Sequence, residues 1–337
     1  MTAQAQVDTV RATTLPPAQV AEKYYNSGVA KFNQKSYQAA LLDFDQAIKA
    51  KADFSKAYYN RAATRYELKQ YAPAVQDYNE AIRLEPGSFT AWYGRAQAKQ
   101  AQSDNDGAEQ DYGKVTELKP DYAPAWYYRG DLRFEKGDYQ AALADFSAAL
   151  KADPKYAYAL HDRGSAQRQL GNYAAAVQDY SEALRLQPEL EVALLNRGAA
   201  KRRQGDAKGA LADYNTYIGR NADNPVAYLG RGQARFEAED YKGAVEDFSK
   251  ALQLKSGYAL ALNNRAAAKL KLDDYKGAEA DATAALQANG QYAEAYLNRG
   301  HAREMLRNPK GACADWRKAA ELGLQAGNSY AAAAGCE

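Results

Sequence analysis

The sequence is poor in the residues from which most metal and enzyme sites are built. Its 337 residues include only two histidines, His161 and His301, and only two cysteines, Cys313 and Cys336. Two imidazoles this far apart do not make a zinc site or a nucleophile with its base. No glycine-rich phosphate loop is present either. We therefore expect no catalytic residue, no metal and no cofactor, and we predict that the chain is not an enzyme.

The charges are balanced, and long apolar stretches are missing. Lys and Arg total 44 against 42 Asp and Glu, which gives a formal net charge of +2. Binding to nucleic acid by phosphate neutralisation needs an excess of basic residues, so no nucleic-acid partner is expected. No run of about 18 apolar residues is present, so no membrane span is expected.

What the sequence has instead is a repeat. Aligned with itself at a shift of 34 residues, the chain gives nine consecutive registers without a gap, from Ala21 to Ala326. The eighth position is always glycine or alanine, and the twenty-fourth is aromatic except at Ala282. The twentieth position is alanine in all nine registers: Ala40, Ala74, Ala108, Ala142, Ala176, Ala210, Ala244, Ala278 and Ala312. Proline occupies the thirty-second position in four registers: Pro86, Pro120, Pro154 and Pro188.

This pattern predicts close-packed pairs of antiparallel helices. Small residues at the eighth and twentieth positions let two helices approach, and large residues at the fourth and twenty-fourth fill the space around that contact. Turn residues such as Gly137 and Gly171 end the first helix, and proline ends the second. The pattern resembles the tetratricopeptide repeat family, whose signature places Leu-Gly, Tyr, Ala, an aromatic residue and Pro at fixed offsets.

The resemblance implies an all-α fold, a right-handed α-solenoid of nine 34-residue helix-turn-helix repeats with a C-terminal capping helix. The expected repeats span residues 21–54, 55–88, 89–122, 123–156, 157–190, 191–224, 225–258, 259–292 and 293–326. Residues 1–20 match no repeat and are expected to form an N-terminal arm. Residues 327–337 are expected to form the cap.

One departure from the family is itself periodic. The seventh position, where the family usually has leucine, is arginine in every repeat except the first, which has Ser27. The twenty-third position is always aspartate. We predict structural ion pairs in which each arginine reaches back to the aspartate of the preceding repeat, which would leave Asp315 without an arginine. The expected pairs are Arg61 with Asp43, Arg95 with Asp77, Arg129 with Asp111, Arg163 with Asp145, Arg197 with Asp179, Arg231 with Asp213, Arg265 with Asp247, and Arg299 with Asp281. The alternative is that these arginines face a ligand.

The resemblance also implies a groove lined by the first helix of each repeat, chiefly through positions 2, 5, 9, 12 and 13. Tyrosine suits such a surface because it has few rotamers and offers both a ring and a hydroxyl. The expected binding residues are Tyr25, Phe32, Tyr59, Tyr66, Tyr93, Tyr127, Phe134 and His161, followed by the basic residues Arg168, Arg202 and Arg203, which could bind carboxylates. The alternative is that the tyrosines pack on one another and only fill the wall.

The N-terminal arm bears on location. It lacks a hydrophobic segment, but Ala3-Gln4-Ala5 is similar to the end of a signal peptide already removed. An ordinary cytoplasmic start is the alternative. Asp8-Thr9-Val10 is similar to an acceptor of bacterial O-glycosylation, which makes Thr9 a candidate glycosylation site.

The two cysteines are placed to meet across one hairpin, because the chain is expected to reverse near Gly323. A disulfide between Cys313 and Cys336 is therefore predicted, and it would need an oxidising compartment. Two unrelated reduced thiols are the alternative. The disulfide favours a periplasmic or extracellular location over a cytoplasmic one.

Together these features predict a scaffold whose groove holds a segment of another protein or a peptide. The alternative is a self-assembling structural protein whose copies stack end to end into a filament or ring. The uncharged segment 324–335 and the arm would then be the contact surfaces.

Overall fold

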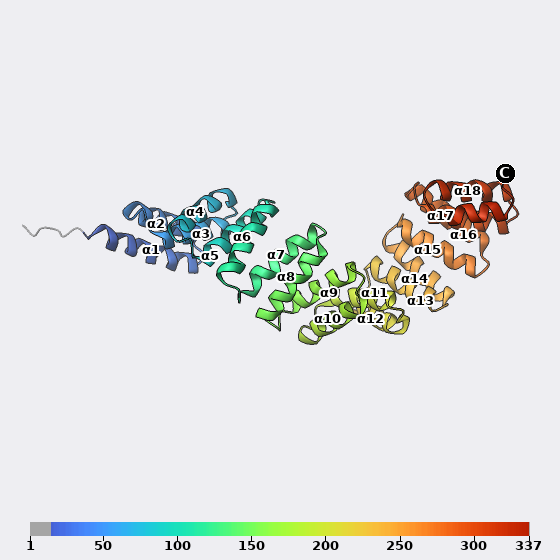
Figure 1. Cartoon of the computed structure of the whole chain (residues 1–337), viewed down its shortest axis with the longest axis horizontal. Coiled ribbons are helices and arrows are strands. Elements are labelled where there is room, and N and C mark those ends of the chain that lie inside the picture. The colour runs from blue at the N-terminus through green and yellow to red at the C-terminus, as the bar shows by residue number, and fades with distance from the viewer. Residues whose placement is uncertain (1–14, 337) are drawn as a thin grey trace, which may run out of the picture. The chain divides into compact units, whose positions relative to one another are not determined.

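The structure is a computed structural model that describes residues 15–336, and this part of the chain is all-helical, with nineteen helices and no strand (Figure 1). The first helices of the nine repeats are α1 (Pro17–Asn33), α3 (Ser55–Glu67), α5 (Phe89–Gln100), α7 (Ala123–Glu135), α9 (Ala157–Gln169), α11 (Glu191–Arg203), α13 (Pro225–Glu237), α15 (Ala259–Lys271) and α17 (Ala293–Met305). The second helices are α2 (Tyr37–Ala50), α4 (Tyr71–Leu84), α6 (Asn105–Leu118), α8 (Tyr139–Ala152), α10 (Tyr173–Leu186), α12 (Ala207–Arg220), α14 (Tyr241–Leu254), α16 (Tyr275–Ala288) and α18 (Pro309–Glu321). The last helix is α19 (Ala326–Ala333).

The helices fall into two compact units that divide inside α9, one ending at Ala159 and the other beginning at Leu160. Within each unit a first helix packs against the second helix of its repeat, as α1 does with α2 and α13 with α14. First helices of neighbouring repeats also pack together, α1 with α3 and α3 with α5 in the first unit. In the second unit α11, α13, α15 and α17 do so in turn. First helices therefore line a common face within each unit.

The turn inside each repeat has the same backbone in all nine repeats. The fifteenth residue always has a positive φ, between 58° and 88°. Glycine adopts this conformation without strain and is present in three repeats, at Gly137, Gly171 and Gly205. The next residue caps the second helix, as when Oδ1 of Asp138 accepts from the backbone N–H of Ala141 at 3.1 Å. This turn ends one helix and begins the next within a few residues.

The predicted contact of small and large residues holds the two helices of a repeat together. A Cβ atom added at Gly28 would lie 2.6 Å from the Phe44 ring, and one at Gly232 would lie 2.6 Å from Phe248. Ala40 and its equivalents are buried in every repeat. At these two positions even a methyl group would collide with the aromatic ring, and the alanines found there in other repeats, such as Ala62 and Ala96, are fully buried.

The repeat frame places the helices accurately. The first helices of repeats two to nine begin at the first residue of the expected repeats. The exception is α1, which begins at Pro17, so residues 17–20 of the expected arm are helical. None of the described helices is long and apolar enough to cross a membrane.

Candidate functional site

The arginine–aspartate pairs form within each repeat, not between repeats as the sequence predicts. Nε and Nη2 of Arg61 donate to the two oxygens of Asp77, at 2.9 and 2.6 Å. The equivalent pairs are Arg95 with Asp111, Arg129 with Asp145, Arg163 with Asp179, Arg197 with Asp213, Arg231 with Asp247, Arg265 with Asp281, and Arg299 with Asp315. The prediction that Arg61 pairs with Asp43, and each later arginine with the preceding aspartate, is wrong. Asp315 accordingly has an arginine partner.

The reason is that the seventh and twenty-third positions face each other across the two helices of one repeat. The first repeat follows the same rule with a shorter donor, since Ser27 donates to Asp43 at 2.6 Å. In six of the eight arginines the remaining nitrogen, Nη1, donates to the preceding repeat. It donates from Arg61 to Asp45 at 2.7 Å, two residues beyond the expected partner.

Sequence reasoning missed a second cation on these aspartates. The eleventh position of eight repeats carries Lys or Arg, and its side chain lies 2.5 to 3.0 Å from an oxygen of the buried aspartate: Lys31, Arg65, Lys99, Arg133, Lys201, Arg235, Lys269 and Arg303. The signal was available, because basic residues recur there every 34 residues except at Gln167. Seven of these carboxylates therefore receive a cation from two successive turns of the first helix, whereas Asp43 receives Lys31 and the hydroxyl of Ser27.

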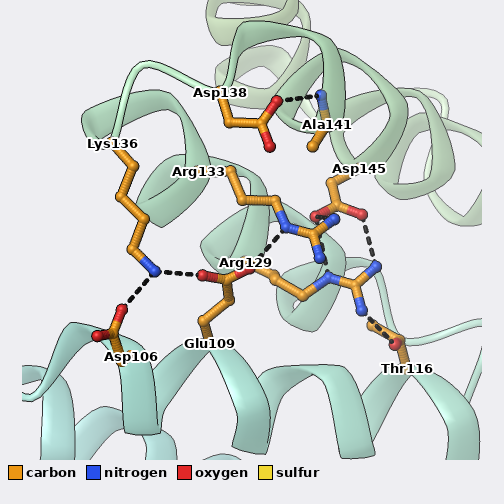
Figure 2. Close-up of polar contacts among 9 residues, drawn as sticks. All are labelled: Asp106, Glu109, Thr116, Arg129, Arg133, Lys136, Asp138, Ala141 and Asp145. Atoms are coloured by element: carbon orange, nitrogen blue, oxygen red, sulfur yellow. Dashed lines mark hydrogen bonds and ion pairs between the residues drawn. The ribbon is translucent and has the colours of Figure 1, made fainter.

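Figure 2 shows the network at repeats three and four. Arg129 holds Asp145 through Nε and Nη2, while Arg133 donates both to Asp145 and to Glu109 of the preceding repeat. Burial would raise the pKa of Glu109, but hydrogen bonds from Lys136 and Arg133 lower it below its ordinary value. These arginines are engaged by the protein itself, which favours a structural role over ligand binding.

On the first-helix face of the first unit, two adjoining cavities of about 350 and 280 Å³ share Tyr66 and Gln97. We call them together the tyrosine groove. Its lining residues are Tyr59, Ala63, Tyr66, Glu67, Tyr78, Phe89, Thr90, Tyr93, Gly94, Gln97, Gln100, Ala101, Tyr112, Tyr122 and Tyr128. Of the predicted binding residues, Tyr59, Tyr66 and Tyr93 are brought together here.

The groove tyrosines also pack on one another. The Tyr93 ring centroid lies 5.6 Å from that of Tyr112 and 5.3 Å from that of Tyr122. Burial raises the pKa of Tyr59 and of Tyr93, so both hydroxyls stay protonated at neutral pH. These rings therefore pack against neighbouring rings and at the same time line the cavity.

The other predicted aromatic residues pack against neighbours in their own repeats. Tyr25 lies against Phe44 and Phe54, and Phe32 against Tyr37. Tyr127 lies against Phe146 and Tyr156, and Phe134 against Tyr139. Tyr59 and Tyr66 pack in the same way, against Tyr78 and Tyr71. What distinguishes Tyr59, Tyr66 and Tyr93 is that they also line the tyrosine groove.

In the second unit, the predicted polar residues have partners within the protein. His161 packs on Tyr180, and its Nε2 lies 3.0 Å from Nδ2 of Asn196. Arg202 pairs with Glu237 of the next repeat. Burial raises the pKa of Tyr214 to about 12, and the positive charge of Arg202 opposes that rise.

The other two predicted arginines differ in exposure. Arg168 is half-buried, and its buried Nε has no hydrogen-bond partner among the described residues. Burial raises the pKa of Tyr180, and the positive charge of Arg168 opposes that rise. Only Arg203 is exposed. Of the three arginines expected to bind carboxylates, Arg202 is therefore already paired with a carboxylate of the protein itself.

Two adjoining cavities in the second unit share Phe236 and Ala267, and the smaller one is lined by Arg202. The smaller, about 170 Å³, is the Arg202 pocket, lined by Arg202, Gln233, Phe236, Glu237, Phe248, Asn264 and Ala267. The larger, about 480 Å³, is the Met305 cavity, lined by Phe236, Ala267, Leu270, Lys271, Tyr275, Asn298, His301 and Met305. Most of these residues belong to the first helices α11, α13, α15 and α17, so the cavities lie on the face where a groove is expected.

A disulfide joins Cys313 of α18 to Cys336 beyond α19, with 5.6 Å between the Cα atoms, which is the predicted pairing. Thr9 and residues 1–14 of the arm lie outside the described residues. Within residues 15–336, no group of three or more His, Cys, Asp or Glu side chains is arranged to hold a metal ion.

The sequence pattern of the tetratricopeptide repeat matches residues 55–88 and four overlapping segments, 93–157, 129–191, 161–225 and 195–259. These segments cover more than half of the chain, and the chain belongs to the tetratricopeptide repeat family. No curated protein matches it.

Solved structures with the same fold are only distantly related in sequence. A tetratricopeptide repeat protein from Parabacteroides merdae is 18% identical, covers 75% of this chain and 99% of its own, and has a TM-score of 0.52. YrrB, a TPR protein with an unusual peptide-binding site, is 21% identical over 56% of this chain and 97% of its own, with a TM-score of 0.52. The Cut9–Hcn1 complex of the APC/C is 14% identical over 97% of this chain and 78% of the matched one, with a TM-score of 0.59. Similarity at this level establishes the fold alone.

Proposed function

We propose that this protein is a non-catalytic interaction scaffold that holds a segment of a partner protein on the face made by its first helices. The tyrosine groove carries this proposal, because it is an open cavity lined by half-buried rings and amides at the positions expected for binding. Rings already held by their neighbours lose little conformational freedom when a partner binds. YrrB, which shares the fold, has a peptide-binding site.

The charge of the groove indicates the kind of contact. Glu67 is the one charged residue among those that line it. Partner binding should therefore rely on ring and amide contacts and should depend only weakly on salt concentration. A steep salt dependence would indicate a different surface.

Blocking the groove tests the proposal. Gln97 lines both cavities, so Gln97→Trp should fill the groove, whereas Gln76→Trp places the same ring on the exposed side of α4. The partner would be captured from the source organism, purified and titrated against both variants by calorimetry. We expect Gln97→Trp to weaken binding by about tenfold or more and Gln76→Trp to have little effect. Equal affinities for both variants would contradict the groove assignment.

Self-assembly is the alternative proposal, and one observation supports it. The side chains of Tyr330, Ala332 and Ala333 on α19 are exposed and carry no charge. Light scattering should then show particles that grow with concentration, and Ala332→Glu should abolish the growth by burying an unpaired charge. A monomer at every concentration would rule this alternative out.

We also propose an oxidising, extracytoplasmic location, supported by the disulfide between Cys313 and Cys336. Protein isolated from its source without reductant and then denatured should contain no free thiol. Two free thiols would contradict this location.

A further inference from the structure

Polar side chains at the fifth and sixth positions pair between neighbouring repeats. In each pair, an asparagine at the sixth position meets an acceptor at the fifth position of the repeat before it. The pairs are Asn60 with Oη of Tyr25 at 3.1 Å, Asn196 with Nε2 of His161 at 3.0 Å, and Asn298 with Oδ1 of Asn263 at 2.8 Å. These contacts satisfy the half-buried amides on the first-helix face.

Asn264 breaks this rule. The residue at the equivalent fifth position is Leu229, which has no acceptor. Among the described residues nothing accepts from Nδ2 of Asn264, and the same is true of Nε of Arg202, although both atoms are buried. A buried donor left unpaired destabilises the protein, because it has lost its hydrogen bonds to water without gaining another. Both line the Arg202 pocket, so one oxygen placed there could satisfy the two together.

We propose that the Arg202 pocket binds the carboxamide side chain of an asparagine or glutamine in the partner segment. The ligand oxygen would accept from Nε of Arg202 and Nδ2 of Asn264. Its NH₂ group would donate to Glu237, which already pairs with Arg202. This inference rests on the proposed function and names what the second unit would recognise in the same kind of partner.

Glu237 is the reason to prefer a carboxamide to a carboxylate. The charge of Arg202 is already balanced by Glu237, so a ligand carboxylate would gain little attraction and would face a like charge. A carboxamide instead accepts from Arg202 and Asn264 and donates to Glu237. Without it, the buried donors of Arg202 and Asn264 are unpaired again. The pocket should therefore favour Gln over Glu, although the two side chains have nearly the same shape.

The adjoining Met305 cavity extends the expected recognition pattern. Leu270 and Met305 give it an apolar wall, and Phe236 and Ala267 are shared with the Arg202 pocket. Burial lowers the pKa of His301, so this ring is neutral at neutral pH. The cavity suits a large apolar side chain a few residues away from the carboxamide, since an extended chain advances about 3.3 Å per residue.

A peptide panel tests the proposal on the full-length protein. The probes are fluorescein-labelled alanine–serine octapeptides with acetyl and N-methylamide ends, so that they carry no other primary carboxamide. Each contains one Gln and one Leu, in either order and separated by none to three residues. Matched sets replace Gln by Glu or by Ala. By fluorescence anisotropy, at least one Gln peptide should bind about tenfold more tightly than both of its counterparts.

Three variants show whether this preference comes from the pocket. Glu237→Gln should reduce the preference for Gln over Glu to about one or invert it, because Arg202 is then unbalanced. Asn264→Leu should weaken the Gln peptide about fivefold or more without lowering the melting temperature, since the unpaired amide is gone. Asn60→Leu is the matched control, because the Asn60 donor is already used by Tyr25, and it should leave the peptide affinity unchanged.

Three results would overturn the proposal. The first is that the Glu peptides bind the unmodified protein as tightly as the Gln peptides, or more tightly. The second is that both Glu237→Gln and Asn264→Leu keep the preference for Gln. The third is that no peptide of any register binds with a Kd below about 1 mM. Any of these, combined with a partner that Gln97→Trp still releases, would leave the scaffold proposal intact. A partner insensitive to Gln97→Trp, together with a clear Gln preference, would retain this pocket and reject the tyrosine groove.

Discussion

Repeats four and five contain the same arginine–aspartate pair in two different settings. In repeat four, Asp145 is held by Arg129 and Arg133, and its side chain is 3% exposed. In repeat five, Arg163 is the one cation paired with Asp179 among the described residues, and the aspartate side chain is 8% exposed. The second cation is therefore not required for the pair itself to form.

The difference comes from one residue. Where repeat four has Arg133, repeat five has Gln167, whose Oε1 is buried and accepts no hydrogen bond from the described residues. A neutral side chain has thus replaced a cation, and its own oxygen is unsatisfied. The two repeats let the contribution of the second cation be separated from that of the bidentate pair.

The largest effect is expected from removing the aspartate. Asp145→Ala leaves partly buried Arg129 without its anion and Arg133 with Glu109 alone, and it should reduce the free energy of unfolding by about 3–5 kcal/mol. Asp179→Ala leaves only one cation unpaired and should cost less. Urea unfolding of the two variants, followed by circular dichroism, measures both. Equal losses would show that the second cation adds nothing.

A smaller effect, of opposite sign, is expected when repeat five is made to resemble the others. Gln167→Lys should place an ammonium group where Lys99, Lys201 and Lys269 hold theirs, within 2.8 to 2.9 Å of the aspartate. It also removes the unpaired carbonyl, so we expect a gain of about 1 kcal/mol.

The matched control is Gln167→Leu, which removes the same carbonyl but adds no charge. If Leu stabilises as much as Lys, the gain comes from the lost carbonyl alone. The reverse change, Lys99→Gln, should lower the melting temperature if the second cation matters.

The same two repeats show what the sequence can predict. The 34-residue period was sufficient to predict where the helices begin and end, because the residues of each turn stop one helix and cap the next. Gly137 adopts the positive φ of the turn, and Asp138 caps the helix that follows. It was also sufficient for the existence of the pairs. It could not say which aspartate Arg61 binds, because Asp43 and Asp77 are equivalent in a one-dimensional repeat. That choice depends on which helix faces the arginine in three dimensions.

The candidate site was harder to predict than the fold. Family positions indicated Tyr59, Tyr66 and Tyr93, which line the tyrosine groove. They did not single out Asn264, which became a candidate only because its buried Nδ2 has no hydrogen-bond acceptor among the described residues. A missing partner becomes visible only when the pairs of the other repeats are known from the structure.

The smallest expected effect is a change with pH, and it arises from Glu109, which extends the network of repeat four. Hydrogen bonds from Lys136 and Arg133 outweigh burial and hold the pKa of Glu109 below its ordinary value of 4.5. Such a group stabilises the folded state above its unfolded pKa, and this contribution is lost as the pH falls through the lowered folded pKa. In repeat five, the residue equivalent to Glu109 in the repeat before it is Leu143, which has no charge to lose.

Glu109→Gln should therefore lower the melting temperature at about pH 7, by an amount equivalent to about 1 kcal/mol, and the difference should shrink as the pH falls below about 4.5. Thermal unfolding at about pH 7, 5 and 3.5 would follow it. Glu117→Gln is the control, because Glu117 forms an exposed pair with Lys114 three residues away and should have little effect at any pH. A difference in melting temperature for Glu109→Gln that stays constant over this range would mean that the carboxylate charge does not stabilise the network. The networks of repeats four and five would then differ in stability only through the second cation of repeat four.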